Sequence, residues 1–209
     1  MKTLTKEVQD ALTPDMAIDI LRKGNERFVN NLKTNRNLLQ QVNETADGQH
    51  PFAAVLSCID SRTSAELIFD QGLGDVFSIR IAGNILNEDI LGSMEFACKV
   101  AGAKAIVVLG HSKCGAVKGA CDDVKMGNLT ALLQKLKPAV DAERITTSER
   151  NSSNAAFVEN VAHLNVKLTL GHILERSPIL NAMNEAGDIA IVGGMYNVDT
   201  GGVEFSPLL

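Results

Sequence analysis

The sequence predicts an α/β fold in which a mostly parallel central β-sheet is flanked by helices and preceded by an N-terminal helical arm. Short apolar runs rich in Val and Ile recur along the chain, mostly without alternation, which is typical of parallel strands buried on both faces. Helical patterns lie between these runs, and this alternation favours a sheet covered on both sides. With 209 residues, 45% of them hydrophobic, the chain can form one domain with a sizeable core.

The individual elements follow from these patterns. The apolar runs predict strands at residues 52–59, 76–81, 105–109 and 189–192, and a last short strand at 202–205 follows a turn-like Asp-Thr-Gly-Gly. Helical spacing predicts helices at residues 14–33, 64–69, 88–101, 116–125 and about 155–175. Thr13 is the expected N-cap of the first helix, with Pro14 at its first position.

The chain divides at about residue 50. Residues 33–50 are polar and rich in Asn and Gln, so we expect an irregular segment that crosses a surface. We therefore predict an N-terminal helical arm and extended segment over residues 1–50, followed by an α/β domain over residues 51–209. No internal repeat or low-complexity linker is visible in the sequence.

Charge and composition exclude several classes of function. The formal net charge is -5 with both signs interspersed, so we expect no nucleic-acid partner and no binding to an anionic membrane. The N-terminus lacks the apolar core of a secretory signal and no stretch is long enough to span a bilayer, so we expect a cytoplasmic protein. Four cysteines are too few for a disulfide framework and would stay thiols there, which makes metal binding worth considering.

Two short motifs follow the first and third predicted strands. They are Cys58-Ile59-Asp60-Ser61-Arg62 and His111-Ser112-Lys113-Cys114-Gly115. Ligands gather at the carboxyl ends of strands in such sheets, so neighbouring strands would bring Cys58 to His111 and Cys114. Two thiolates and one imidazole suit zinc, and three protein ligands leave the fourth position open, as in catalytic sites.

Other interpretations of these residues have to be weighed. A single cysteine at the end of a buried strand usually belongs to the core, and H-x-x-C alone is a weak pattern, so the prediction depends on their conjunction. Cys98 and Cys121 lie on apolar helical faces and are expected to be core residues. His50, His163 and His172 have no partner at metal-ligand spacing and are expected to be ordinary surface or core histidines.

The combination C-x-D-S-R followed by H-x-x-C-G resembles the β-carbonic anhydrases. The resemblance extends from Gln49 to about Glu204 and includes RIAGN at 80–84, MEFA at 94–97, LGHSKCGAVKGA at 109–120 and VGGMYNVDTG at 192–201. It implies the β-carbonic anhydrase fold, with one Zn²⁺ per subunit on Cys58, His111 and Cys114. It also implies reversible hydration of CO₂ to bicarbonate and a proton, and self-association as a homodimer or a dimer of dimers.

The resemblance further implies that Asp60 and Arg62 form a catalytic dyad beside the metal. Zinc lowers the pKa of bound water from about 15.7 toward about 7, so hydroxide exists at neutral pH and can attack CO₂. Asp60 would accept a hydrogen bond from the hydroxide and orient it, while Arg62 would hold the carboxylate in a bidentate pair. Without the neighbouring cysteine, the same two residues would indicate an ordinary salt bridge in a turn.

Three further positions match residues that bind substrate in the family. Gln49 matches a glutamine that donates a hydrogen bond to the substrate from the partner subunit, although a solvated loop residue is the plainer interpretation. Phe77 matches an aromatic residue on the apolar side of the pocket, although a strand phenylalanine is more often core. Gly115 matches the glycine after the second cysteine, where a side chain would crowd the metal.

Two differences from relatives also matter. Phe96 stands in the Glu-Phe-Ala segment where plant-like members often have tyrosine, so any contribution of that hydroxyl is missing. The chain has no Trp and so lacks the tryptophan of the non-catalytic bicarbonate pocket in the allosteric bacterial subgroup. We therefore expect the constitutively open type, in which Asp60 stays on Arg62 and leaves the fourth metal position free.

Two alternative functions stay open at this point. Relatives on this scaffold hydrolyse carbonyl sulfide or carbon disulfide with the same ligands, and only pocket shape and access would separate these enzymes. A non-catalytic zinc-binding structural subunit is the other alternative. Asp60, Arg62 and Gln49 argue against it, because a structural site needs ligands but no activating dyad.

Overall fold

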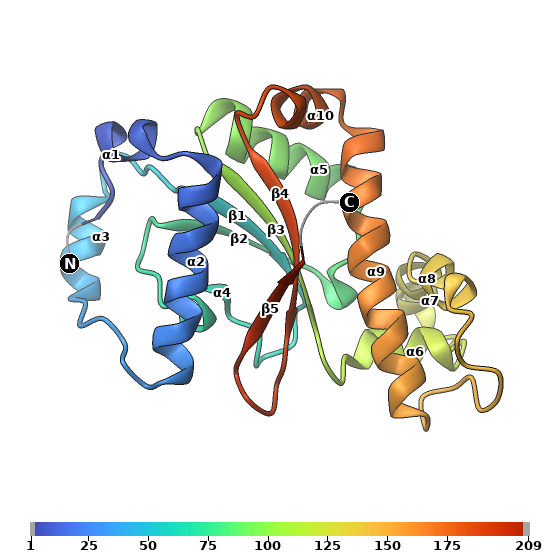
Figure 1. Cartoon of the computed structure of the whole chain (residues 1–209). Coiled ribbons are helices and arrows are strands. Elements are labelled where there is room, and N and C mark those ends of the chain that lie inside the picture. The colour runs from blue at the N-terminus through green and yellow to red at the C-terminus, as the bar shows by residue number, and fades with distance from the viewer. Residues whose placement is uncertain (1–2, 207–209) are drawn as a thin grey trace.

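A five-stranded sheet in the order β2-β1-β3-β4-β5 forms the centre of the computed structural model, which describes residues 3–206 (Figure 1). Its strands are Ala53–Ser57 (β1), Val76–Arg80 (β2), Ala105–His111 (β3), Ala190–Tyr196 (β4) and Val203–Ser206 (β5). Strands β1 to β4 are parallel, and β5 pairs with β4 in the antiparallel direction. The predicted fold class and all five predicted strands are confirmed, but β3 and β4 extend to residues 111 and 196, beyond their most apolar stretches.

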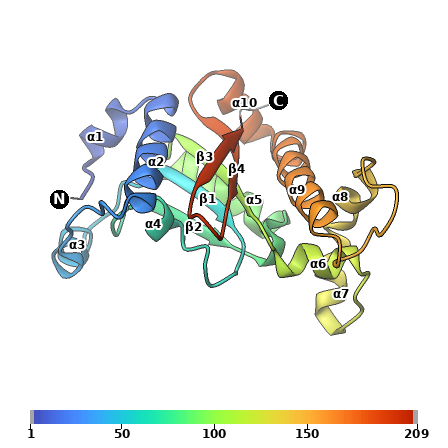
Figure 2. The same ribbon diagram turned by 60° about the horizontal axis from the view of Figure 1, so that its bottom comes forward.

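Helices cover both faces of this sheet (Figures 1 and 2). Two of the helices, α2 and α4, lie on one face; α5, α9 and α10 lie on the other; α6, α7 and α8 form a group beside α9. The α-helices are Lys6–Ala11 (α1), Pro14–Val29 (α2), Leu38–Glu44 (α3), Ala65–Ile68 (α4), Glu88–Glu95 (α5), Gly115–Cys121 (α6), Gly127–Gln134 (α7), Lys137–Ala142 (α8), Ala155–Arg176 (α9) and Pro178–Glu185 (α10). A 3₁₀ turn, Ala82–Asn84 (η1), and a π-helical turn, Phe96–Val100 (η2), complete the set. No helix within residues 3–206 is long and apolar enough to cross a membrane.

The helix α3 corrects the prediction that residues 33–50 are irregular. The Asn37 side chain accepts a hydrogen bond from the Gln40 amide at the start of this helix. Gln41 is buried, and its side-chain oxygen accepts a hydrogen bond from the amide of Leu73. Polar side chains therefore fix this helix through specific hydrogen bonds, which an apolar periodicity does not reveal.

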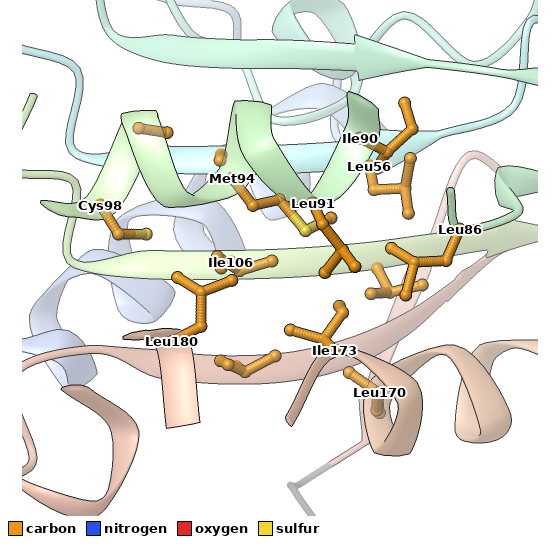
Figure 3. Close-up of a cluster of buried hydrophobic side chains, with 14 of the residues drawn as sticks. Leu56, Leu86, Ile90, Leu91, Met94, Cys98, Ile106, Leu170, Ile173 and Leu180 are labelled. Carbon is orange, nitrogen blue, oxygen red and sulfur yellow. The ribbon is translucent and has the colours of Figure 1, made fainter. Parts of the chain in front are cut away.

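The sheet separates two layers of core. In β1, Ala53 and Val55 face the α2 and α4 side, whereas Ala54 and Leu56 face the side of α5, α9 and α10. Figure 3 shows the second layer, in which Leu56 lies with residues of α5 and α9. Every residue of β1 and β3 is buried, as expected for central parallel strands covered on both faces.

The first predicted helix is attached to the body of its own subunit. Ala17 and Leu21 of α2 are fully buried against the sheet. We expected a helix at residues 14–33; α2 instead ends at Val29, and its apolar face is covered within the same chain. The division of the chain at residue 50 stays a prediction.

Asp70 ties the N-terminal arm to the α/β domain. Its carboxylate is nearly fully buried and pairs with Arg27 Nε at 2.6 Å and with Arg36 Nη1 at 2.5 Å. The backbone and hydroxyl of Thr34 donate to it as well. Burial alone would raise the pKa of Asp70, but the hydrogen bonds from Arg27, Arg36 and Thr34 lower it from 3.8 to about 2.

We expect Asp70→Asn to lower the free energy of unfolding by about 3 kcal/mol at neutral pH, because the buried Arg36 and the partly exposed Arg27 lose their charge partner. Since the folded pKa lies below the unfolded value, the ionised carboxylate stabilises the wild type above about pH 4, and this stabilisation is lost as the pH falls toward 2. Denaturant titrations from pH 7 to pH 2 should show the two proteins converging in acid. A gap that stays constant over that range would contradict this account. Asp10→Asn, which breaks the exposed pair with Lys6, is the control and should leave the melting temperature unchanged.

Candidate metal centre

The sheet brings the two sequence motifs to one edge. β1 and β3 are neighbouring parallel strands with Ser57 opposite Leu109, so the next residue, Cys58, stands level with Gly110, one position before His111. Cys114 then begins the next helix, α6, as its N-cap. The predicted meeting of Cys58, His111 and Cys114 is therefore a direct result of strand order and register.

The geometry of these three side chains fits one tetrahedral ion. The two sulfur atoms lie 4.0 Å apart, and the ligand atoms of all three residues lie within 4.8 Å of one another. With zinc–sulfur bonds of about 2.3 Å, a tetrahedral ion places two thiolates about 3.8 Å apart. Within residues 3–206 this is the one group of three or more His, Cys, Asp or Glu side chains close enough to share a metal.

The histidine presents a free nitrogen in a buried position. His111 is 1% exposed, and its Nδ1 lies 2.9 Å from the carbonyl oxygen of Ser112, to which it donates in the Nδ1–H tautomer. Its Nε2 is buried and has no hydrogen-bond partner. A buried nitrogen lone pair without a partner is costly, and a metal ion at this position would satisfy it.

The two thiols influence each other's proton affinity. A hydrogen bond from the Cys114 thiol lowers the pKa of Cys58, and His111 and the Gly83 amide lower it further against the effect of burial. The neighbouring Cys58 sulfur raises the pKa of Cys114 in turn, with burial adding to the effect, while the amides of Ala116 and Val117 oppose it. The pair therefore gives up its first proton easily, and a cation between the sulfurs would favour loss of the second.

A tight turn returns the chain from His111 to Cys114. Lys113 adopts a left-handed backbone conformation with φ of 58°, which is uncommon for a residue other than glycine. Gly110, the residue before His111, has no room for a side chain, because a Cβ there would lie 2.6 Å from both Met195 Sδ and Val166 Cγ2. Close packing on one side and a turn on the other thus fix the two ligands of this motif.

Asp60 and Arg62 form a bidentate ion pair beside the three ligands. Arg62 Nε and Nη2 donate to the two carboxylate oxygens at 2.9 and 2.8 Å, and the Arg62 backbone amide adds a third bond at 3.0 Å. These bonds, with the nearby His111, hold the pKa of Asp60 far below its usual range. The Asp60 side chain is 18% exposed and Arg62 is half-exposed, so the dyad lies at the mouth of the site.

The loop that carries Cys58 and Asp60 is fixed by two residues whose role the sequence motifs do not reveal. Thr63 Oγ1 donates to the carbonyl oxygens of Cys58 and Asp60 at 2.9 and 2.8 Å. Arg80 donates to the same two carbonyls, with Nε 3.1 Å from Cys58 O and Nη2 2.6 Å from Asp60 O. The signal for Arg80 was its place in the RIAGN segment, which resembles the family without revealing this contact.

Tyr196 is a further neighbour of the dyad that sequence reasoning did not single out. It ends β4 opposite His111, is 6% exposed, and is the one tyrosine of the chain. Burial raises the pKa of this phenol, and the charges of Arg62 and Asp60 act on it in opposite directions. Its position in VGGMYNVDTG was the available signal.

Gln49 and Phe77 do not lie beside the three ligands of their own chain. Gln49 is exposed and precedes the amino end of β1, whereas Cys58 follows its carboxyl end, and the steps from Ala53 to Ser57 alone span about 13 Å. Phe77 pairs with Ala54 in the register of β1 and β2, three residues before Ser57. The substrate-binding roles of both residues stay predictions.

Gly115 and the remaining cysteines can also be placed. A Cβ on Gly115 would meet no atom within 4 Å beyond its chain neighbours and its own helix backbone, so its expected role of keeping space for a metal stays a prediction. Cys98 is 2% exposed among the apolar side chains of Figure 3, where burial raises its pKa to about 12. Cys121 is half-buried against the group around α6, where burial, helped by Asp122, raises its pKa to about 11.

Comparisons with known proteins agree on one family. The sequence model that describes the carbonic anhydrases matches residues 53–203. Carbonic anhydrase 2 of Mycobacterium tuberculosis is 36% identical over 196 residues, which cover 90% of each chain. A β-carbonic anhydrase structure from Aspergillus fumigatus has a TM-score of 0.69 at 28% identity over 82% of each chain. One of two tetrameric β-carbonic anhydrases from Sordaria macrospora has a TM-score of 0.66 at 30% identity, covering 77% of this chain and 82% of that one.

Proposed function

The chain belongs to the β-carbonic anhydrase family, and from that premise we propose that it is a zinc enzyme with one Zn²⁺ per subunit that interconverts CO₂ and bicarbonate. The observation that carries the proposal is the buried group of Cys58, His111 and Cys114, with the free Nε2 of His111 facing no protein partner. Zinc held there would lower the pKa of a water molecule and supply hydroxide at neutral pH. A cytoplasmic location is part of the proposal, because both thiols must stay reduced to bind a metal.

The chain's own residues account for the orientation of the nucleophile. Asp60 is ionised across the neutral range because Arg62 holds its pKa low, so it is an acceptor and not a donor. It would therefore accept the hydroxide proton in a hydrogen bond and direct the oxygen lone pair toward the carbon of CO₂. Arg62 fixes the carboxylate through two parallel bonds, and Thr63 and Arg80 fix the loop beneath it.

A stopped-flow hydration assay on protein of known zinc content tests the function. CO₂, carbonyl sulfide and carbon disulfide are assayed in parallel as substrates. We expect hydration of CO₂, at a rate that depends on the amount of bound zinc. Turnover of either sulfur gas without CO₂ hydration would assign the alternative hydrolase activity. Zinc without activity on any of the three would favour a structural subunit.

We also propose that a second copy of the chain covers the free edge of the sheet. β2 is an edge strand, and beside it lies a groove of about 830 Å³ that Phe77, Ile79, Arg80 and Phe96 help to line. Phe96 is 54% exposed and packs edge-on against Phe77, with ring centroids 6.4 Å apart. An uncovered edge strand flanked by aromatic surface favours pairing with another chain.

Such a pairing would explain the positions of Gln49 and Phe77. Two copies related by a two-fold axis would place their β2 strands antiparallel. The amino end of one β2, with Phe77, would then lie beside the carboxyl end of the other, next to its Cys58. Both substrate-binding residues would thus serve the zinc site of the partner subunit.

Phe96→Glu should shift the assembly toward monomers at micromolar concentration and lower the activity per zinc, because it replaces an exposed aromatic ring by a negative charge in a groove that Glu88 and Asp89 also line. Sedimentation velocity and the hydration assay measure the two effects. Ile145→Glu is the matched control, since Ile145 is 82% exposed in a different part of the molecule and should change neither. An active wild-type monomer would refute the proposed dimer.

Mixing Gln49→Ala subunits with Cys58→Ala subunits tests whether Gln49 acts across the interface. A mixed dimer holds one intact zinc site facing one intact Gln49 of the partner subunit, so activity should be recovered. If no activity is recovered, Gln49 does not act across the interface.

A further inference from the structure

A buried amide on α9 connects that helix to the metal centre. Asn165 is 5% exposed, and its Nδ2 donates to the carbonyl oxygen of Gly83, 82 residues earlier, at 2.9 Å. Its neighbours on the buried face of α9 include Ala162, Val166 and Thr169. A polar group in such a position costs free energy unless it is hydrogen-bonded, so the bond to Gly83 is its principal compensation.

Gly83 contacts one of the metal ligands through its other peptide group. Its backbone N–H donates to Cys58 Sγ at 3.3 Å. Gly83 has a left-handed conformation with φ of 67°, and an added Cβ would lie 2.9 Å from Leu136 Cδ1 and 3.2 Å from Ala116 Cβ. The backbone at this point is therefore closely packed, and the hydrogen bond from Asn165 fixes the orientation of the carbonyl on the same residue.

We propose that Asn165 is a positioning residue of the zinc centre, which acts through Gly83 to orient the Cys58 sulfur. Hydrogen-bond partners outside the ligand shell orient the ligands themselves. The inference rests on the proposed function only in taking zinc as the occupant of the site. It adds a residue that neither sequence motif contains.

The test compares two asparagines of the same helix. Asn160 also donates through Nδ2, but to Glu143 Oε1 at 3.2 Å, away from the metal ligands. Asn165→Leu removes the donor at similar volume and should raise the zinc dissociation constant by about 10- to 100-fold, as measured by competition with a chromophoric chelator. Its cobalt-substituted form should show a shifted thiolate-to-cobalt absorption band. Asn160→Leu should leave both measurements as in the wild type.

Further measurements separate the expected effect from misfolding of Asn165→Leu. Asn165→Ala also removes the donor but adds no branched side chain, and circular dichroism of each metal-free variant establishes that the variant is folded. In wild-type protein loaded with ¹¹³Cd, the Gly83 amide proton should show scalar coupling to cadmium across the N–H···S bond, and absence of this coupling would overturn the contact between Gly83 and Cys58. A folded Asn165 variant with wild-type zinc affinity and a wild-type cobalt spectrum would overturn the positioning role of Asn165. A wild-type protein that binds no zinc would instead overturn the metal of the proposed function.

Discussion

Substitution of Cys58, His111 or Cys114 by alanine should remove zinc and CO₂ hydration together. Each change takes one of three ligands from a buried site, and the two that remain cannot complete a tetrahedral zinc site without further solvent ligands. The activity should fall to that of the metal-free protein. Elemental analysis after dialysis against a weak chelator and a hydration assay on the same sample measure both quantities.

The two other cysteines provide matched controls for these variants. Cys98→Ser and Cys121→Ser should keep one zinc per subunit, because Cys98 lies in the apolar core and Cys121 packs beside α6. The first should lower the melting temperature more, since Cys98 is the more deeply buried and a hydroxyl there has no partner prepared. Loss of metal in either serine variant would show that the ligand set is wrongly assigned.

The sequence was sufficient to predict the strands, and it predicted the meeting of the three ligands on the condition that the first and third strands are neighbours. The Val- and Ile-rich runs mark buried parallel strands, and the carboxyl ends of two neighbouring parallel strands must lie at the same edge. The structure supplies the condition, because β1 and β3 pair directly. Within the sheet the strand ends were imprecise; in β3, for example, Gly110 and His111 continue the strand without adding hydrophobicity.

Features that depend on single long-range contacts were not predictable in this way. The segment 38–44 folds as α3 because buried Gln41 contacts the backbone near Leu73, and no periodicity records such a contact. Arg80 and Asn165 donate to backbone carbonyl oxygens near the metal ligands, and because every residue type carries such an oxygen, the sequence gives no signal for these contacts. The predicted strand at residues 52–59 already placed Gln49 before the start of β1, at the opposite end from its own Cys58, and the structure agrees.

The second large effect is expected for the dyad. Asp60→Asn and Arg62→Ala should each retain zinc but lower kcat/KM for CO₂ hydration by about 100-fold, because they disturb the orientation of the nucleophile and leave the three ligands in place. Asp60→Asn replaces one carboxylate oxygen by a donor that faces Arg62, which destroys the bidentate pair. Asp123→Asn is the control, since that carboxylate pairs with Lys125 on the exposed surface and should affect the rate less than about twofold.

A double variant separates a joint role from two independent ones. If Arg62 acts only by holding Asp60, then the Asp60→Asn, Arg62→Ala protein should lose no more activity than Asp60→Asn alone, as expected for residues that work as one unit. Losses that multiply would mean that Arg62 contacts the substrate independently.

The single variant Arg62→Ala also tests whether the metal site is open in the resting enzyme. In wild-type crystals grown at about pH 7 to 8, near the pKa of zinc-bound water, Asp60 should remain on Arg62, because both carboxylate oxygens accept hydrogen bonds from the guanidinium. In Arg62→Ala the carboxylate is released, and acidification should favour its coordination to zinc, since water is a weaker ligand than hydroxide. An Asp60 oxygen at bonding distance from zinc in the wild type at that pH would show that the site is closed by default.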